Sequence, residues 1–143
     1  TDVTIYCSNE PAAALDIEFA IDYESQKLQI DRILEDFRLL VVPLAAYMRD
    51  NPAFPWTEQG LHALIQPATT GNPPINFPEG GYIDSIPSDP WGRDYDYVCE
   101  PFAGIVIPYK LQSLGADGVE GGSGENADIK HSYLPYFDHI NQL

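Results

Sequence analysis

Residues 28–50 read LQIDRILEDFRLLVVPLAAYMRD, with apolar residues at mixed spacings of three to seven positions and charged residues between them. The pattern continues upstream and predicts one helix from about Pro11 to Asp50, because such spacings place apolar side chains on one helix face. Pro11 suits a first helical turn, whereas Pro43 is expected to kink the helix. The apolar positions are Ile17, Ile21, Leu28, Ile33, Phe37, Leu40, Leu44 and Met48.

This predicted helix is long for a chain of 143 residues. At about 1.5 Å per residue, a helix of roughly 38 residues is near 57 Å long, which exceeds what a domain of this mass needs. Part of the helix is therefore expected to project or to pack on other molecules. The length of the chain itself fits one domain, residues 1–143.

After Asp50, proline and glycine become frequent, which favours a compact second part over residues 51–143. A short helix is predicted at Thr57–Ile65, and an ordered loop from Ala68 to Pro90. The strand-forming segments 95–99 and 105–111 predict a β-hairpin, in which Pro108 favours an edge position or a bulge. The chain is thus predicted to have an α+β fold.

The charge of the chain excludes several classes of partner. The sequence has 22 Asp and Glu against 7 Lys and Arg, a formal net charge of -15. Nucleic acid and anionic lipid surfaces attract clustered Lys and Arg, and the few cations here form no cluster along the sequence. Carboxylates suit a hard cation such as Ca²⁺.

Residues 114–129 read LGADGVEGGSGENADI and combine glycines with carboxylates. Ca²⁺ takes six to eight oxygen ligands, and glycine lets the backbone turn several carbonyl groups toward one ion. The segment is not an EF-hand, because Val119 and Gly121 stand where that motif needs Asp or Asn. From composition alone, both a calcium loop and a solvated flexible loop fit this segment.

Catalytic residues are not evident in the sequence. The three histidines are far apart and are expected at the surface, and no nucleophile elbow is present. Cys7 and Cys99 form no CxxC motif, and they are either unrelated thiols or one long-range disulfide. The chain is therefore interpreted as a protein that is not an enzyme.

Four groups of residues together resemble the major pseudopilin of the type II secretion system. The chain carries Tyr47 with Asp50 and Asn51, then FPWTEQGLHAL at 54–64, and GGYIDSIPSDPWGRDY at 80–95. The loop then supplies GADG at 115–118 and NADI at 126–129. The similarity covers roughly residues 27–130 in the family's order.

The resemblance implies a type IV pilin-like fold: a long N-terminal spine helix packed on a small C-terminal domain with a short helix and an antiparallel β-sheet. It implies a structural subunit of a periplasmic pseudopilus, a helical filament that helps drive folded proteins across the outer membrane. The implied partners are further copies, minor pseudopilins and inner-membrane secretion components. A calcium-dependent pilin-like adhesin or binding module is the alternative.

The resemblance also implies one structural Ca²⁺ in the loop 114–129. The carboxylates of Asp117 and Asp128 correspond to the family's metal ligands, and Glu125 and Asn126 lie nearby. Two carboxylates within one loop repel each other until a divalent ion neutralises them. The full expected ligand set is Asp117, Asp128, backbone oxygens of Leu114 and Val119, and an oxygen of Ser123.

The start of the chain departs from the family. The family's apolar membrane anchor would fall on residues 1–25, where this sequence carries several acidic residues that cannot lie in hydrocarbon. We therefore expect the inner-membrane anchor of the full-length protein to lie upstream of Thr1, with residues 1–25 as an insertion. A divergent member that assembles differently is the other interpretation. The acidic residues are Asp2, Glu10, Asp16, Glu18, Asp22 and Glu24.

Overall fold

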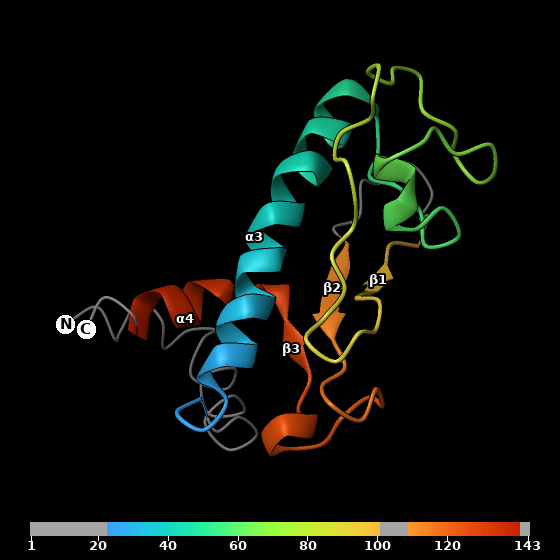
Figure 1. Ribbon diagram of the computed structural model, residues 1–143. Coiled ribbons are helices and arrows are strands. Elements are labelled where there is room, and N and C mark those ends of the chain that lie inside the picture. Colours follow the sequence, from blue (N-terminus) through green and yellow to red (C-terminus); the bar gives the residue numbers. More distant parts are fainter. Residues whose placement is uncertain (1–22, 101–108, 141–143) are drawn as a thin grey trace.

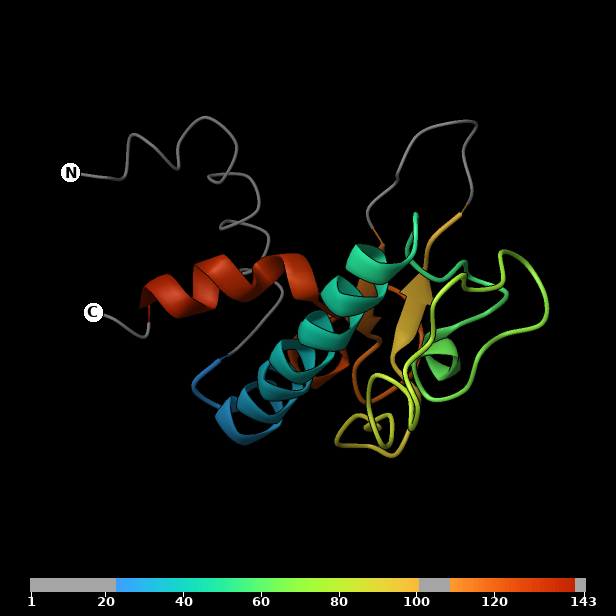
Figure 2. The same ribbon diagram turned by 90° about the horizontal axis from the view of Figure 1, so that it is seen from above.

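The computed structural model describes residues 23–100 and 109–140. The long helix α3 (Lys27–Asp50) lies along one face of a small sheet, and the short helix α4 (Leu134–Ile140) lies beside α3 (Figures 1 and 2). The sheet contains β1 (Asp96–Val98), β2 (Lys110–Ser113) and β3 (Ile129–Lys130) in that order, all antiparallel. Short 3₁₀ helices complete the described elements: η1 (Leu61–Leu64), η2 (Gly124–Asn126) and η3 (His131–Tyr133). The predicted pilin-like α+β architecture is confirmed.

The core forms between α3 and the inner face of the sheet. The buried residues of α3 follow a helical spacing, and Leu28, which the periodicity grouped with them, is instead 84% exposed. Side chains alternate along a strand, so Leu111 and Ser113 of β2 point inward while Lys110 is exposed. The ring of Phe37 meets that of Tyr95 at 5.2 Å between centroids. The buried apolar residues of α3 are Ile30, Ile33, Leu34, Phe37, Leu40, Leu44 and Tyr47.

Pro43 lies inside α3 and does not end it. A proline inside a helix leaves the carbonyl group four residues earlier without its amide partner. That carbonyl belongs to Leu39, a residue that is 52% exposed. Pro43 itself is buried, so its ring packs in the interior. The predicted helix was too long at its start, because residues 23–26 form a turn and α3 begins at Lys27. Residues 11–22 of that prediction lie outside the described residues.

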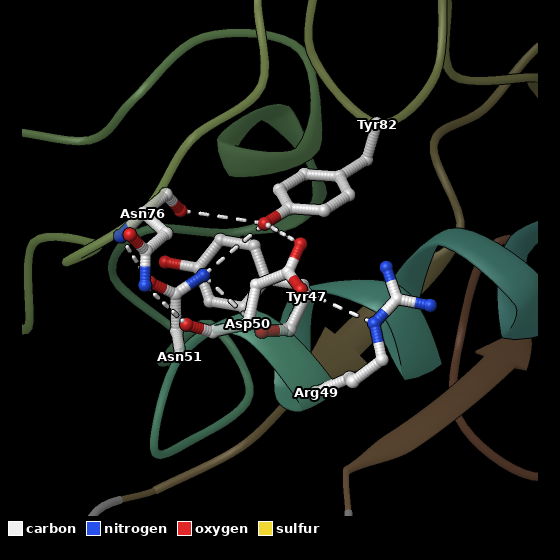
Figure 3. A network of polar contacts seen from close by, with 6 residues as sticks. All are labelled: Tyr47, Arg49, Asp50, Asn51, Asn76 and Tyr82. Carbon is white, nitrogen blue, oxygen red and sulfur yellow. Dashed lines mark hydrogen bonds and ion pairs between the residues drawn. The ribbon is translucent and has the colours of Figure 1, made fainter.

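The end of α3 is fixed by a polar network around Asn51 (Figure 3). Asn51 is 5% exposed, and its Oδ1 accepts hydrogen bonds from the backbone N–H groups of Ile75 and Asn76 at 2.7 and 2.8 Å. The hydroxyl of Tyr82 donates to Oδ2 of Asp50 at 3.0 Å. The loop between residues 68 and 90, predicted as ordered, is therefore attached to the end of the helix.

Two further predicted elements differ from the structure. The helix expected at Thr57–Ile65 is only the 3₁₀ turn η1, because Gly60 has φ +68° and extended ψ, which no α-helix continues. The hairpin is present, with Tyr97 opposite Leu111, but β2 continues to Ser113, past the predicted end. Residues 105–108, including Pro108, lie outside the described residues. Among the described residues, no helix has the length and apolar character needed to cross a membrane.

Helix α4 packs against the N-terminal half of α3. Phe137 is fully buried, and its ring lies 5.4 Å from that of Tyr23. Arg38 of α3 donates to Oδ1 of Asp138 at 2.5 Å. The last described helix is thus held by both an apolar and a charged contact.

Candidate metal-binding loop

The loop that follows β2 has its two ends fixed by the sheet. Ser113 of β2 is opposite Ile129 of β3 in the antiparallel register. The same register, continued by one residue, places Leu114 opposite Asp128 at the mouth of the loop. Two of the five predicted metal ligands therefore meet because of strand pairing, although they are far apart in sequence.

Asp128 has one satisfied and one unsatisfied carboxylate oxygen. Its Oδ2 accepts a hydrogen bond from the backbone N–H of Gly121 at 2.9 Å. Its Oδ1 is buried and has no hydrogen-bond partner. A buried carboxylate oxygen without a partner loses its hydration without replacement, which is costly unless a cation is near. This oxygen therefore fits the predicted calcium ligand.

Asp117 lies on the exposed part of the loop. Its Oδ1 accepts a hydrogen bond from the backbone N–H of Val119 at 3.1 Å, which closes a short turn around the carboxylate. Val119 is 62% exposed and Ser123 is also exposed, whereas Leu114 is half-buried. Neither Val119 nor Ser123 packs in the core. Their oxygen atoms are therefore available as metal ligands.

Two glycines are needed where two segments of the loop backbone approach each other closely. Gly115 and Gly122 have φ of +74° and +92°, a region that favours glycine. A Cβ atom at Gly115 would lie 2.6 Å from the carbonyl carbon of Asn126, and one at Gly122 would lie 2.7 Å from the Asn126 oxygen. The backbone N–H of Ala116 also donates to the carbonyl of Glu125 at 2.8 Å. The loop is therefore a closed, tightly folded unit.

Three residues that sequence reasoning did not assign to the site position the loop from outside it. Asp89, 3% exposed, accepts hydrogen bonds at Oδ1 from the backbone N–H groups of Trp91 and Arg93. The hydroxyl of Ser113 donates to Oδ2 of Asp89 at 3.3 Å and accepts from the N–H of Gly115 at 3.2 Å. The turn at residues 89–93 is thereby joined to the start of the loop.

Arg93 extends this support across the loop. Its Nη1 donates to the carbonyl of Ala116 at 2.7 Å and makes a longer contact to that of Gly115 at 3.4 Å. Its side chain passes so close to Gly118 that a Cβ atom there would lie 2.5 Å from Nε. The DPWGR segment could have suggested a turn from its sequence, but its contact with the loop depends on the tertiary fold.

Most of the expected ligands in the loop are backbone carbonyl oxygens or a serine oxygen, and only two are carboxylates. Within residues 23–100 and 109–140, no three His, Cys, Asp or Glu side chains form a metal-binding cluster. The two aspartates would therefore need the carbonyl groups of Leu114 and Val119 and an oxygen of Ser123. Such a mixed oxygen set suits Ca²⁺ rather than zinc.

The remaining candidate groups, a thiol and the imidazoles, lie outside the loop 114–129. Cys99 is buried, and burial raises the pKa of its thiol, which disfavours the thiolate. Its predicted alternative partner, Cys7, lies outside the described residues. His131 is half-buried and stacked on Tyr109, so the prediction of a surface position was wrong for this histidine. His62 is exposed, as predicted.

Comparison with known proteins identifies relatives across both the helix and the loop. The sequence model of the family described as "Type II secretion system (T2SS), protein G" matches residues 24–132. The type II secretion system core protein G of Pseudomonas aeruginosa is 46% identical over 95 residues, which are 66% of this chain and 64% of that protein. The corresponding protein of Vibrio cholerae is 43% identical over 105 residues, 73% of this chain and 68% of that protein.

A solved structure matches as well. It is the crystal structure of the major pseudopilin from the type 2 secretion system of enterohaemorrhagic Escherichia coli, with a TM-score of 0.63 and 34% sequence identity. The match covers 75% of this chain and 89% of that chain. All five predicted metal ligands lie inside the range 24–132, whereas α4 begins after its end.

Proposed function

The chain belongs to the type II secretion system protein G family, and we propose that it serves as a structural subunit of a periplasmic pseudopilus that helps move folded proteins across the outer membrane. The observation that carries this proposal is the family match over residues 24–132, which includes the long helix, the sheet and the loop. Its partners in this role are further copies of itself, minor pseudopilins and inner-membrane components of the secretion system.

The outer face of α3 supports a role in assembly. Leu39 and Val42 are 52% and 69% exposed although both are large and apolar. A shallow groove beside them is lined by Val41, Ala45, Ala46, Arg49, Phe54 and Tyr109 together with Val42. Contiguous apolar surface on an isolated subunit is typical of a protein contact. A helix of a neighbouring subunit would bury this face.

A chimera tests the proposed assembly role. Residues 24–132 would replace the corresponding segment of the P. aeruginosa relative in a strain that lacks its own copy. The proposal predicts that secretion of folded proteins is restored, and that Val42→Glu in the chimera abolishes it because a charge enters the apolar contact. Glu35→Gln, on an exposed position of the same helix, is the matched control. A stable, folded chimera that restores no secretion would contradict the proposal.

We further propose that the loop 114–129 binds one Ca²⁺ through Asp117 and Asp128, with oxygens from Leu114, Val119 and Ser123. The unpartnered buried Oδ1 of Asp128 and the closed, glycine-dependent path of the loop support this assignment. The ion would neutralise the repulsion between carboxylates in a segment with little apolar content. Its role is to brace the loop, and no reaction is involved.

Isothermal titration with Ca²⁺ measures this binding directly. We expect one site per chain in the wild type and none in Asp128→Asn, because the amide removes one negative ligand. Asp84→Asn changes an exposed acidic residue outside the loop and should leave the titration unaltered. Absence of binding in the wild type, or equal binding in Asp128→Asn, would contradict the assignment.

A further inference from the structure

Most cations of this acidic chain are already engaged within the subunit. Four of them form ion pairs with carboxylates of the same chain, and Arg93 donates to the carbonyl of Ala116. Among the described residues, Lys110 and Lys130 have no carboxylate within ion-pair distance. The four paired cations are Lys27 with Asp31, Arg32 with Asp36, Arg38 with Asp138, and Arg49 with Asp50.

The two remaining lysines lie on the outer face of the sheet. Lys130 of β3 is opposite Gln112 of β2, and Lys110 lies two residues before Gln112 on the same strand. Side chains two residues apart on a strand share one face, so both lysines project from the face opposite the core. Both are exposed.

The lysines line a cavity of about 600 Å³. The lining also includes Tyr109, on which His131 is stacked at 4.9 Å between ring centroids. The ammonium group of Lys130 lies 5.9 Å from the centre of the Tyr133 ring. Both lysines and aromatic residues therefore line the cavity, and Tyr109 and His131 alternate with the lysines and lie toward the core face of the sheet.

Two other titratable groups face the same cavity. His131 is half-buried, and burial lowers its pKa, so the imidazole adds no positive charge at neutral pH. Glu120, from the loop after β2, also lines the cavity and is exposed. Asp96 of β1 lies on the same face of the sheet, where its Oδ2 accepts a hydrogen bond from Nε2 of Gln112 at 2.8 Å. Neither Glu120 nor Asp96 lies within ion-pair distance of Lys110 or Lys130, on a chain whose net charge is -15.

Copies of a chain with a net charge of -15 repel each other when they are packed closely. A stable contact between copies therefore needs cations that are not already neutralised within the subunit. We propose that Lys110 and Lys130 form a docking site for carboxylates on the surface of a second copy of this chain. This inference rests on the proposed assembly function, and it assigns the electrostatic part of the contact.

The charge of the site also restricts the type of contact. A twofold contact centred on the lysines themselves would place those of one copy against those of the other, which is repulsive. The lysines must instead meet a different, acidic surface of the second copy.

Zero-length carbodiimide cross-linking tests the site, because it joins a lysine amine to a carboxylate only where the two are in contact. The full chain would be mixed in ¹⁴N and ¹⁵N forms, so that linked peptides from two different copies are identified by mass. The lysines of the chain are Lys27, Lys110 and Lys130. We expect links between copies at Lys110 and Lys130. Links between copies at Lys27 alone would overturn the inference.

Sedimentation velocity at low and high salt gives a second measurement. K110E/K130E should weaken self-association at low salt by about tenfold, since two exposed ion pairs are each replaced by repulsion. K27Q, which breaks an ion pair within the subunit, is the control and should leave association unchanged. Association of K110E/K130E equal to that of the wild type would overturn this inference alone. A wild-type chain that shows no self-association or cross-links would overturn both this inference and the proposed assembly.

Discussion

The backbone N–H of Gly121 donates a hydrogen bond of 2.9 Å to Oδ2 of Asp128, seven residues farther along the chain. This bond closes the loop across its width and orients the carboxylate, whose other oxygen is buried without a partner. The bond thereby fixes the orientation of the carboxylate that we propose as a ligand of Ca²⁺. Asp128 therefore holds the loop closed through Gly121.

Asp117→Ala should loosen the loop and leave α3 intact. The change removes the acceptor for the N–H of Val119 and one of the two proposed carboxylate ligands. In hydrogen exchange followed by mass spectrometry, amides between residues 115 and 127 should exchange faster in Ca²⁺, while those of α3 remain protected. Asp84→Ala is the control. Faster exchange along α3 as well would show that the loop and helix unfold together, against this account.

Arg93→Ala should destabilise the protein by about 1–2 kcal/mol, because the carbonyl group of Ala116 loses its charged donor. Urea unfolding measures the change. Arg49→Ala is the matched control, since Arg49 forms an exposed ion pair with its neighbour Asp50 that contributes less than about 1 kcal/mol. Equal losses in the two variants would mean that Arg93 does not support the loop.

Phe137→Ala should cost about 3 kcal/mol or more, since the ring is fully buried and its removal leaves a cavity beneath α4. The same urea titration measures it. Leu39→Ala on the exposed face of α3 should change the free energy of unfolding by no more than about 0.5 kcal/mol. A small effect of Phe137→Ala would show that α4 contributes little to the fold.

His131 should make the stability fall as the pH is lowered. Burial lowers the pKa of its imidazole in the folded protein below the ordinary value of 6.5, so the unfolded chain binds the proton more readily. The contribution of the neutral ring is present above pH 6.5 and is lost as the pH falls below it. His131→Phe keeps an aromatic ring on Tyr109 and should show a smaller loss between pH 7.5 and 5.5. An unchanged pH dependence would contradict this assignment.

The sequence predicted the elements that depend on local pattern. The apolar spacing before Asp50 identified α3, and the strand-forming segments identified the hairpin of β1 and β2. The start of the helix predicted at Thr57–Ile65 was misjudged because Gly60 adopts a positive φ, which composition does not reveal. Helix α4 was not predicted, since its burial depends on the distant residues Tyr23 and Arg38.

The metal-binding role of the loop stays a prediction. Asp117 and Asp128 were identified by resemblance to the family, and the unpartnered oxygen of Asp128 fits that assignment. The supports from Asp89, Ser113 and Arg93 could not be found from the sequence, because each acts across a distance of more than twenty residues. Ser113 lies on β2, whereas Asp89 and Arg93 come from the turn that precedes β1, so the pairing of β1 with β2 is what brings these groups together.

The thermal unfolding of the wild-type chain in Ca²⁺ and in excess EGTA tests the calcium assignment most directly. A ligand that binds only the folded state at about 100 times its dissociation constant stabilises it by about 2.7 kcal/mol. We therefore predict a melting temperature that is several degrees higher in Ca²⁺, a difference that disappears in Asp128→Asn and persists in Asp84→Asn. A wild-type melting curve that is unchanged in excess EGTA would contradict the account.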